Sequence, residues 1–309
     1  MSSAPIAPLA GIVAVAALSV ATVGVFRRGG GPARARFLGH RGVSAGLCWL
    51  LFVGAVALLA PLLAPYRPSR QLDIVALADH APSWQYLLGT DLLSRDLLSR
   101  LLYGARVSLG IGALAMAVAA TIGAFVGVVS GYFQRSVDSV LMRIVDLGLS
   151  IPRTFVILVI VALAERVSLG GLVLVLGLTG WFGTSRLVRA EVLAIRSSGF
   201  VTSARALGAT PWRIVWRDIV PNATAPLIVS AALGVGNVIL LEAALSFLGA
   251  GVQAPQASWG NMIADGRDQL VTAPWTTLFP GLAILLAVMA LNAVGDGLRD
   301  ALDPRGATP

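Results

Sequence analysis

The stretch GFVTSARALGATPWRIVWRDIVPN, residues 199–222, is a polar and basic insert between two long apolar segments. A run of helix formers leads into Gly208, and glycine commonly ends a helix because the left-handed region is open to it without steric cost. Pro211 fits the first turn of a second helix, where no backbone N–H is needed. Pro221 is expected to stop or bend that second helix. The pattern predicts two short helices joined by a sharp break.

The second helix has two kinds of surface. Its apolar face consists of the residues at i, i+3, i+4 and i+7, namely Trp212, Val215, Trp216 and Ile219. Arg213 and Arg217 lie together on another face. An amphipathic helix of this kind needs a partner, which is either another protein or the headgroup layer of a membrane.

The spacing of this insert resembles the cytoplasmic loop of ATP-binding-cassette (ABC) importer permeases. The family pattern is Glu-Ala-Ala, three residues, Gly, nine residues and Ile-x-Leu-Pro. Gly208 and Pro221 stand at its Gly and Pro, Ala204 matches the second Ala, and Thr202 replaces the Glu. In that family the loop docks on the ATPase subunit, so the resemblance implies a coupling surface here. Its residues are Ala204, Arg205, Leu207, Gly208, Ala209, Trp212, Arg213, Trp216 and Pro221.

The composition is that of a polytopic membrane protein. Of 309 residues, 57% are hydrophobic and 12% are charged, against about 25% charged in soluble domains. All 23 residues of the Lys and Arg class are arginine. A Walker A loop needs a lysine on the phosphates. ATP and Mg, if they drive this protein, must therefore bind to partner subunits, and the chain itself is expected to bind no cofactor and to catalyse no covalent reaction.

Other chemistry is excluded by the scarcity of ligand residues. Cys48 is the single cysteine, so an intrachain disulfide and a cysteine metal cluster are both excluded. His40 and His80 lie on either side of an apolar segment, which makes a metal site between them improbable. The formal net charge of +8 does not indicate nucleic acid, because in a membrane protein the positions of the arginines carry the information.

Seven segments are apolar and long enough to cross about 30 Å of hydrocarbon. They are approximately 5–26, 43–65, 107–133, 140–164, 167–185, 223–247 and 274–295. A secretory signal peptide has its positive charge in front, whereas the arginines near 5–26 follow it. Residues 5–26 are therefore either an extra N-terminal helix or an artefact of an upstream start site.

The distribution of arginine predicts the orientation. With 43–65 running outward, the inside loops hold 15 arginines and the outside regions seven. The positive-inside rule then places the loop 186–222 and the tail 299–309 in the cytoplasm. The segments 66–106 and 248–273 lie outside. The expected organisation is an N-terminal segment with a basic linker over 1–42, a permease domain over 43–298, and the cytoplasmic tail.

Four further stretches resemble the C-type permease subunits of dipeptide, oligopeptide and nickel importers. They cover residues 87–109, 135–155, 258–275 and 292–305. In the first, Thr90 or Asp91 is expected to cap a helix, with Asp91/Arg95 and Asp96/Arg100 as i, i+4 ion pairs. This region is either a plain interfacial helix or a contact for a substrate-binding protein. The contact residues are expected to be Asp91, Arg95, Trp259 and Arg267.

Polar residues within the spans are the remaining functional candidates. Charges inside a membrane are costly and usually face a cavity or a partner. Asn237, Glu242 and Asp146 are therefore candidates for the transport pathway or for a subunit interface. The glycines of 107–133 are instead expected to pack helices closely. Pro152 is expected to bend the fourth span.

The expected fold is all-α: a polytopic membrane protein with the six-helix core of a type I ABC importer permease plus one N-terminal hydrophobic helix. The resemblance implies a multi-pass protein of a bacterial cytoplasmic (inner) membrane, embedded in lipid. Its implied partners are a homologous B-type permease, ATP-binding subunits and an extracytoplasmic binding protein. The implied substrates are peptides, with nickel complexes or glutathione-like molecules as alternatives. A proton-coupled secondary transporter, with Asp146 and Glu242 as its relay, and a non-transporting scaffold are the rival classes.

Overall fold

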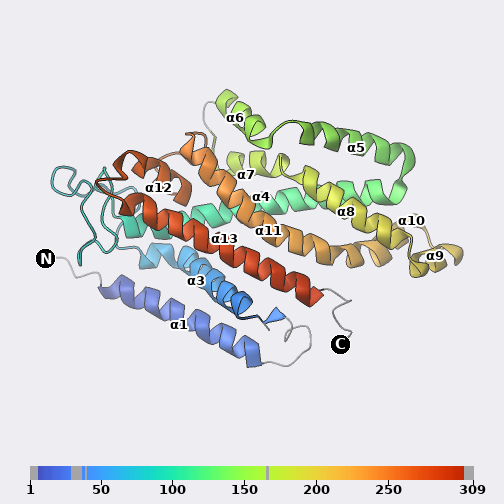
Figure 1. Ribbon diagram of the computed structural model, residues 1–309, viewed down its shortest axis with the longest axis horizontal. Helices are drawn as coiled ribbons and strands as arrows, with labels where there is room; N and C mark the ends of the chain where they lie inside the picture. The colour runs from blue at the N-terminus through green and yellow to red at the C-terminus, as the bar shows by residue number, and fades with distance from the viewer. Residues whose placement is uncertain (1–5, 29–36, 39, 165–166, 303–309) are drawn as a thin grey trace. The chain divides into compact units, whose positions relative to one another are not determined.

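The computed structural model describes residues 6–28, 37–38, 40–164 and 167–302 (Figure 1). The regular elements of these residues are all helical, and only two isolated bridges, Gln71 with Arg95 and Thr90 with Asp96, pair extended chain. The predicted all-α class is confirmed. Residues 29–36, which make up most of the basic linker, lie outside the described residues. The tail residues 303–309 also lie outside them, and these include the last part of the motif 292–305.

The helix bounds are α1 Ile6–Arg28, α3 Arg41–Leu63, α4 Leu97–Phe133, α5 Arg135–Ser150, α6 Arg153–Leu163, α7 Leu169–Leu178, α8 Trp181–Arg196, α9 Gly199–Ala206, α10 Pro211–Ile214, the π-helix η1 Val215–Ile219, α11 Val220–Phe247, α12 Trp259–Gly266, the 3-10 helix η2 Arg267–Gln269 and α13 Trp275–Leu302. From α4 to α13 the helices follow one another with short connections except between α11 and α12, and a longer connection over residues 64–96 precedes α4. Five helices of the described chain are long and apolar enough to cross a membrane, and two bent helix pairs bring the number to seven.

The chain forms two compact units. The first contains Met1–Gly112 and Gly236–Gly297, and the second contains Ala113–Val235 and Leu298–Pro309. The long helices α4 and α11 each contribute one part to each unit. The division separates the residues expected outside the membrane, which belong to the first unit, from the insert at 199–222, which belongs to the second.

The first unit is built around α3. The N-terminal helix α1 lies along α3 (Figure 1), and Gly11 approaches Leu63 so closely that a Cβ would lie 2.5 Å from its Cδ2. Val15 of α1 is buried in one cluster with Val56 and Ala60 of α3 and with the first turns of α4. Residues 6–28 are thus a packed helix of spanning length.

Helix α3 also packs on α13. A Cβ at Gly46 would lie 3.0 Å from the carbonyl oxygen of Ala290, and one at Gly297 would lie 2.7 Å from Val43. Small residues at both contacts let the two backbones approach, which is how helices associate in lipid.

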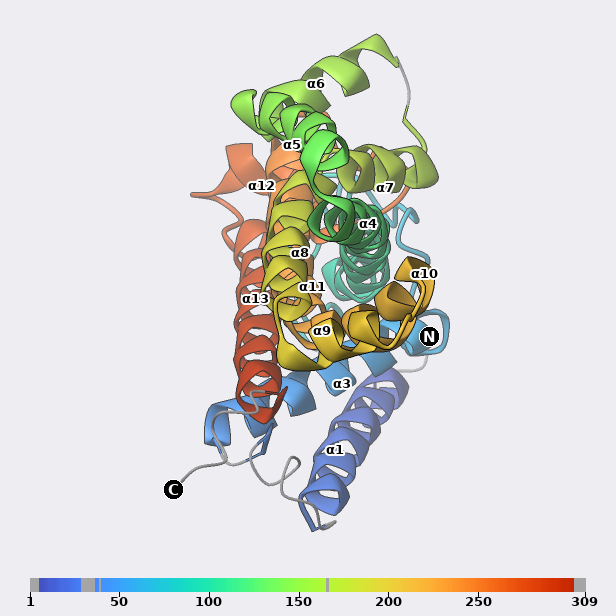
Figure 2. The ribbon, with the colours of Figure 1, turned by 90° about the vertical axis from the view of Figure 1, so that its right-hand side faces the viewer.

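The second unit is built on the contact between α4 and α8. Gly123, Gly127 and Gly131 follow one another at four-residue intervals on one face of α4, and a Cβ on any of them would lie 2.6–2.8 Å from a side-chain or backbone atom of α8. The predicted packing role is confirmed for these three glycines but not for Gly110, where a Cβ would meet no atom within 4 Å. At one end, α8 leads directly into α9 and α10 (Figure 2).

Two predicted spans are broken helices. The segment 140–164 is interrupted at Ile151 and Pro152, where α5 and α6 meet at 81°, and the two helices run in different directions in Figures 1 and 2. The expected bend at Pro152 is confirmed, and the change of direction is so large that the chain forms two separate helices there. The segment 167–185 is bent by 42° between α7 and α8, which the sequence pattern did not predict.

Arg153 connects the break between α5 and α6 with the break between α7 and α8. Its Nη2 donates to the carbonyl oxygen of Leu176 at 2.5 Å, and its Nε donates to Thr179 Oγ1 at 3.2 Å. A guanidinium group at the C-terminal end of α7 satisfies a carbonyl that the helix itself leaves free and is favoured by the helix dipole. A Cβ at Gly180 would lie 2.8 Å from the same Nη2.

Candidate functional site

The break between the two short helices of the insert is a complete capping motif. After α9 ends at Ala206, Gly208 has φ +83°. Its N–H donates to the carbonyl of Arg205 at 3.0 Å, and the N–H of Ala209 donates to the carbonyl of Ala204 at 3.1 Å. These two bonds define a Schellman motif, and the positive φ is the reason for glycine at this position. The predicted break at Gly208 is confirmed.

The second helix begins as predicted but does not end at Pro221. Thr210 caps it by accepting from the N–H of Arg213 at 3.4 Å, and Pro211 occupies its first turn. The helix then widens into the π-turn η1 and continues through Pro221 into α11, so that 211–247 is one span candidate of 37 residues. Of the two expected effects of Pro221, stopping the helix is wrong, and bending it stays a prediction.

The π-turn explains why the proline is tolerated. In an α-helix the ring of Pro221 would clash with the carbonyl of Arg217, four residues earlier. Widening the preceding turn to a π-helix moves that carbonyl away, and the side chain of Asn222 donates to the carbonyl of Asp218 at 2.6 Å. Such π-turns occur frequently at functional sites.

The predicted apolar face is divided into an inward and an outward part. Val215 and Ile219 are buried with Ile214, and they pack against residues of α4, α8 and α9, which are Tyr132, Val188, Val192 and Val201. Trp212 and Trp216 instead point outward, with 61% and 57% of their surface exposed. The sequence pattern placed all four residues on one face, and the widened turn changes that grouping.

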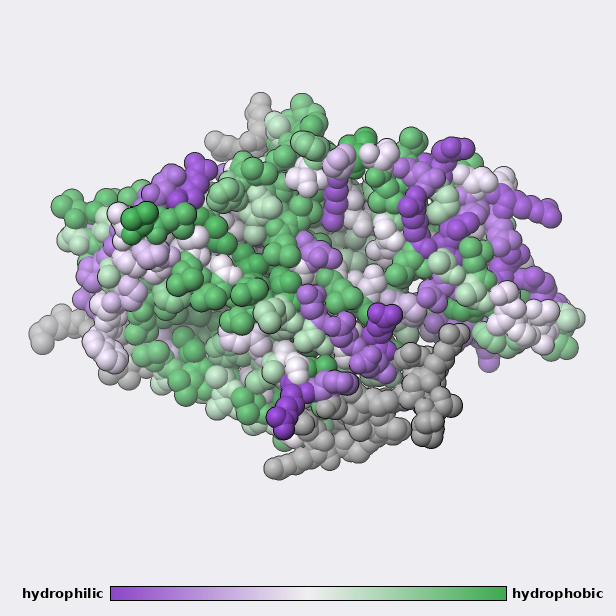
Figure 3. Space-filling view, in the orientation of Figure 1, coloured by the Kyte–Doolittle hydropathy of each residue, from purple (hydrophilic) through white to green (hydrophobic). Residues whose placement is uncertain are grey.

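The two tryptophans form the centre of an exposed surface that we call the coupling surface. Their rings meet edge to face, 5.8 Å apart. Leu207 beside them is 89% exposed, and Arg205 and Arg213 are exposed and make no ion pair with the described residues. Figure 3 shows hydrophilic residues gathered where α8, α9 and α10 lie, in contrast to the largely hydrophobic surface over the spans.

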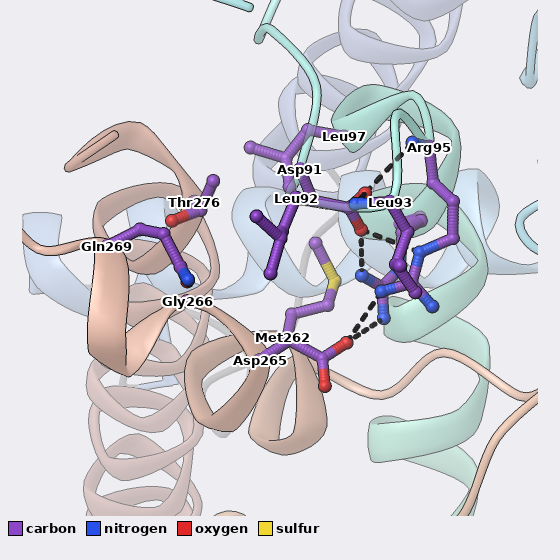
Figure 4. A pocket seen from close by; sticks show the side chains of 11 residues that line it. Asp91, Leu92, Leu93, Arg95, Leu97, Met262, Asp265, Gly266, Gln269 and Thr276 are labelled. Carbon is purple, nitrogen blue, oxygen red and sulfur yellow. Dashed lines mark hydrogen bonds and ion pairs between the residues drawn. The ribbon is translucent and has the colours of Figure 1, made fainter. Parts of the chain in front are cut away.

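At the other group of candidate residues, four charged side chains form one cluster, which we call the ion quartet (Figure 4). Asp91 binds both Arg95, at 2.7 Å, and Arg100. Asp265 of α12 accepts from Arg95 at 2.8 Å and from Arg100 at 2.9 Å. The predicted pair Asp91/Arg95 is confirmed, whereas Arg100 pairs with Asp91 and Asp265 rather than with Asp96.

Asp96, not Thr90 or Asp91, caps helix α4. Its Oδ2 accepts from the N–H of Ser99 at 2.8 Å and from the hydroxyl of Ser99 at 2.6 Å. Burial raises the pKa of Asp96 above its usual value, and the negative charge of Asp91 also raises it, while the two bonds from Ser99 act in the opposite direction. The helix begins at Leu97 because residues 89–96 form a tight turn closed by the bridge between Thr90 and Asp96.

The residues proposed to contact a binding protein differ in accessibility. Trp259 is only 2% exposed, and its indole N–H donates to the carbonyl of Leu101 at 3.1 Å. Asp91 is also buried. In this conformation both are therefore interior residues and cannot present their side chains to another protein. Arg267 is exposed, and Arg95 is partly accessible.

Glu242 is the centre of a buried hydroxyl cluster. The glutamate is 0% exposed, and its Oε1 accepts from Ser246 at 2.7 Å and from Ser258 at 2.9 Å. Its Oε2 lies 3.5 Å from the hydroxyl of Ser108, which in turn accepts from the N–H of Trp259 at 3.0 Å. The carboxylate thus connects α4, α11 and the start of α12.

Asn237 and Asp146 are not part of that cluster. Asn237 is exposed on α11, and a polar side chain on an apolar span fits a role at an interface or cavity. Asp146 is exposed on α5 and pairs with Arg186 of α8. Nearby, Asp138 forms a two-pronged ion pair with Arg189, with both N–O distances at 2.6 Å. These two ion pairs hold α5 against α8, and sequence spacing offered no signal for them.

A pocket of about 170 Å³ lies beside the ion quartet (Figure 4). Its charged edge is the quartet itself, and its apolar wall includes Leu92, Leu97 and Met262. Between this pocket and the Glu242 cluster, α12 is fastened at both ends, through Ser258 at its start and Asp265 at its last turn.

Two family models match the chain. Residues 119–307 match the binding-protein-dependent transport system inner membrane component. Residues 32–82 match the N-terminal transmembrane domain of oligopeptide transport permease C. The first match contains the insert at 199–222 and the stretches 135–155, 258–275 and 292–305, whereas the stretch 87–109 lies in the segment 83–118 between the two matches.

Curated relatives cover most of the chain. The dipeptide transport system permease protein DppC of Alkalihalophilus pseudofirmus is 41% identical over 255 residues, which is 81% of each chain. The di/tripeptide transport system permease protein DppC of Pseudomonas aeruginosa is 40% identical over 275 residues, covering 87% of this chain and 90% of the relative.

Among solved structures, an inward-facing form of the MetNI methionine ABC transporter matches with a TM-score of 0.58. At 19% identity, with 67% of this chain and 98% of that chain covered, the match supports the fold alone. The apolar helices, the family model and the curated relatives together identify a multi-pass protein of the inner membrane. The chain belongs to the binding-protein-dependent transport system inner membrane components, as an ABC importer permease of the dipeptide/oligopeptide family.

Proposed function

We propose that this chain is the non-catalytic permease subunit of an ATP-driven peptide importer. Relatives at about 40% identity are named for dipeptide and di/tripeptide transport, which supports peptides as the substrate class. The chain would pair with a homologous B-type permease and receive its cargo from an extracytoplasmic binding protein. The transport step is alternating access between the two sides of the membrane.

The coupling surface supports the assignment of ATPase docking to residues 199–222. Two exposed tryptophans stand on a helix whose opposite side is anchored by buried Ile214, Val215 and Ile219. Tryptophan is enriched among the residues that contribute most to protein interfaces. Because the same helix continues through the π-turn into α11, a push on Trp212 or Trp216 is transmitted along a single rigid element.

ATP and Mg belong to the partner subunits in this proposal. The chain has no lysine and therefore no Walker A loop. The energy of hydrolysis must accordingly enter mechanically, through a surface such as the one at Trp212 and Trp216. A proton-coupled transporter would need no such surface, and uptake that persists without the ATPase subunits but collapses with the proton potential would favour it.

The double variant Trp212→Ala/Trp216→Ala tests the proposal in the reconstituted importer. Truncating an interface anchor typically costs about 2 kcal/mol or more, roughly a thirtyfold loss of affinity. The ATPase subunits should no longer copurify, and ATP-driven uptake should stop. The control is Trp84→Ala, which removes a still more exposed tryptophan, 84% accessible, from the region predicted to lie outside. Normal uptake by the double variant with the ATPase subunits bound would exclude this docking surface.

A further inference from the structure

Two guanidinium groups are held rigidly on the side of the first unit predicted to be extracytoplasmic. The side chain of Arg100 is 3% exposed and rests on buried Asp91. Asp91 itself is saturated: its Oδ1 accepts from the N–H groups of Leu93 and Arg95 at 3.0 and 2.9 Å, and its Oδ2 accepts from Arg95 and Arg100. A carboxylate offers about four such sites. Asp91 is therefore a fixed counter-ion that positions both arginines.

Asp265, the other carboxylate of the quartet, is held differently. Its side chain is 44% exposed. Only Oδ2 is used, accepting from Arg95 and Arg100 at 2.8 and 2.9 Å, and Oδ1 accepts no hydrogen bond from the described residues. Its partners Arg95 and Arg100 are 13% and 3% exposed, so Asp265 is the solvent-accessible member of the quartet. Asp265 is thus the partner that another carboxylate can replace.

A second pocket, of about 590 Å³, opens on these same groups. Among the described residues, its charged lining consists of Arg95, Arg100 and Arg267 against the single carboxylate of Asp265. Asp91 lies behind the arginines and does not line it. Arg267 pairs only with its exposed neighbour Asp268, at 3.5 Å. Within the lining, three guanidinium groups thus face one carboxylate, while their counter-ions Asp91 and Asp268 lie outside it.

The form of the pocket indicates a small ligand. Its volume lies within the range of about 300–1,000 Å³ that is usual for small-molecule sites. One acidic side chain from a docking protein would fill only part of it. Gln253, Gln256 and Asn261 also line the wall. The amide nitrogens of Gln253 and Asn261 already donate to backbone carbonyls of this chain, whereas the side-chain amide of Gln256 makes no hydrogen bond with the described residues and can donate to or accept from a peptide group.

We propose that this pocket binds the C-terminal carboxylate of a peptide substrate, which replaces Asp265 on Arg95 and Arg100 and is also drawn by Arg267. The inference rests on the proposed peptide importer function and adds a substrate site in the permease, at the entrance to the membrane. Guanidinium groups match a carboxylate with two parallel hydrogen bonds, which favours an acid strongly over a neutral amide. The displaced Asp265 then lies where it can pair with the ammonium end of a short peptide.

The experiment is a binding titration of the purified complete importer, without its binding protein, in lipid nanodiscs. The probes are the dipeptide Ala-Phe and its C-terminal amide, followed by saturation-transfer NMR. The free acid should bind, and the amide should bind roughly tenfold more weakly. Asp265→Asn should tighten binding of the acid, because it removes the internal competitor. The matched control is Asp73→Asn, an exposed carboxylate of the region predicted to lie outside that is not in the pocket lining and should leave the affinity unchanged.

The direction of the Asp265 effect separates a binding role from a structural one. If Asp265 only stabilises α12, Asp265→Asn should weaken binding or leave it unchanged, and either result overturns the inference. Equal binding of the acid and the amide overturns it as well. If Asp265→Asn instead tightens the association of the binding protein while Ala-Phe binding is unchanged, the occupant is an acidic side chain of that protein and the peptide assignment is wrong.

A parallel uptake measurement distinguishes failure of this inference from failure of the proposed function. The wild-type importer with its binding protein is assayed for ATP-driven uptake of Ala-Phe. Uptake without acid-selective binding in the pocket overturns the pocket alone. Absence of uptake for any short peptide counts against the peptide importer itself.

Discussion

Gly208 is the residue at which backbone conformation, rather than side-chain packing, determines the shape of the coupling surface. A Cβ at this position would meet no atom within 4 Å, so there is room for a side chain. The constraint is the φ of +83°, which L-residues with a branched Cβ resist. A substitution therefore changes the capping motif and leaves the core beneath it intact.

Gly208→Val should strain the break between α9 and α10 by about 1–2 kcal/mol and displace Leu207 and Trp212. Asparagine tolerates the left-handed region, so Gly208→Asn is the matched control and should retain most activity. Substrate-stimulated ATPase activity of the reconstituted importer is the readout. Equal activity of the two variants would show that the positive φ does not matter for coupling.

Asp96 provides a test at the outer end of α4. Because its pKa is raised in the folded state above the unfolded value of 3.8, the folded protein binds this proton more tightly than the unfolded chain. The associated stability is fully present below the unfolded pKa and is lost as the pH rises through the folded pKa. Asp96→Asn, which retains a capping oxygen, should flatten the dependence of the melting temperature on pH above about 4.

Asp96→Ala is the companion variant, because it removes the cap as well as the charge. It should destabilise the protein by about 0.5–2 kcal/mol relative to Asp96→Asn at every pH. Melting curves of the purified protein in detergent across the acidic range measure both effects. A wild-type pH profile in Asp96→Asn would mean that burial of this carboxylate has no energetic consequence.

At the scale of elements, the broken helices show what a local pattern can and cannot predict. Pro152 predicts a bend because its ring and missing N–H disrupt any helix. Pro221 has the same local chemistry, yet the chain continues through it, because a π-turn and the side chain of Asn222 accommodate the proline. The outcome depends on packing of the buried residues around η1, which come from five different helices, α4, α8, α9, α10 and α11.

Arg153 should stabilise the arrangement of the two broken helix pairs. Arg153→Gln loses the charged donor to the carbonyl of Leu176 and should cost about 1.5–3 kcal/mol, the usual value for hydrogen bonds to charged groups. Arg143→Gln, which neutralises an exposed arginine of α5 that makes no ion pair with the described residues, is the control. The melting temperatures of the two variants in detergent should differ by several degrees. Identical melting temperatures would contradict the role of Arg153 in connecting the two broken helix pairs.

For the whole molecule, periodicity and composition predicted the spans, and spaced motifs predicted the family. Neither the periodicity, the composition nor the motifs predicted the Glu242 cluster. Its serines lie at positions 108, 246 and 258, and only Ser246 stands one helical turn from the glutamate. The burial of Trp259 could not be predicted from the sequence either, because the same motif is compatible with a tryptophan that contacts another protein and with one that packs in the core. Only the tertiary structure distinguishes contacts within the chain from surfaces left for partners.

The assignment of the coupling surface to the ATPase can be tested by one cross-linking measurement. Cys48 is the single native cysteine, so Cys48→Ser provides a background for introduced thiols. In that background Trp212→Cys should cross-link to an ATPase subunit in the assembled importer. Trp84→Cys, at a position that is more exposed but predicted to lie outside, should not. Failure of Trp212→Cys to cross-link in an importer that still transports, or cross-linking from Trp84→Cys, would contradict the proposed route of energy into the permease.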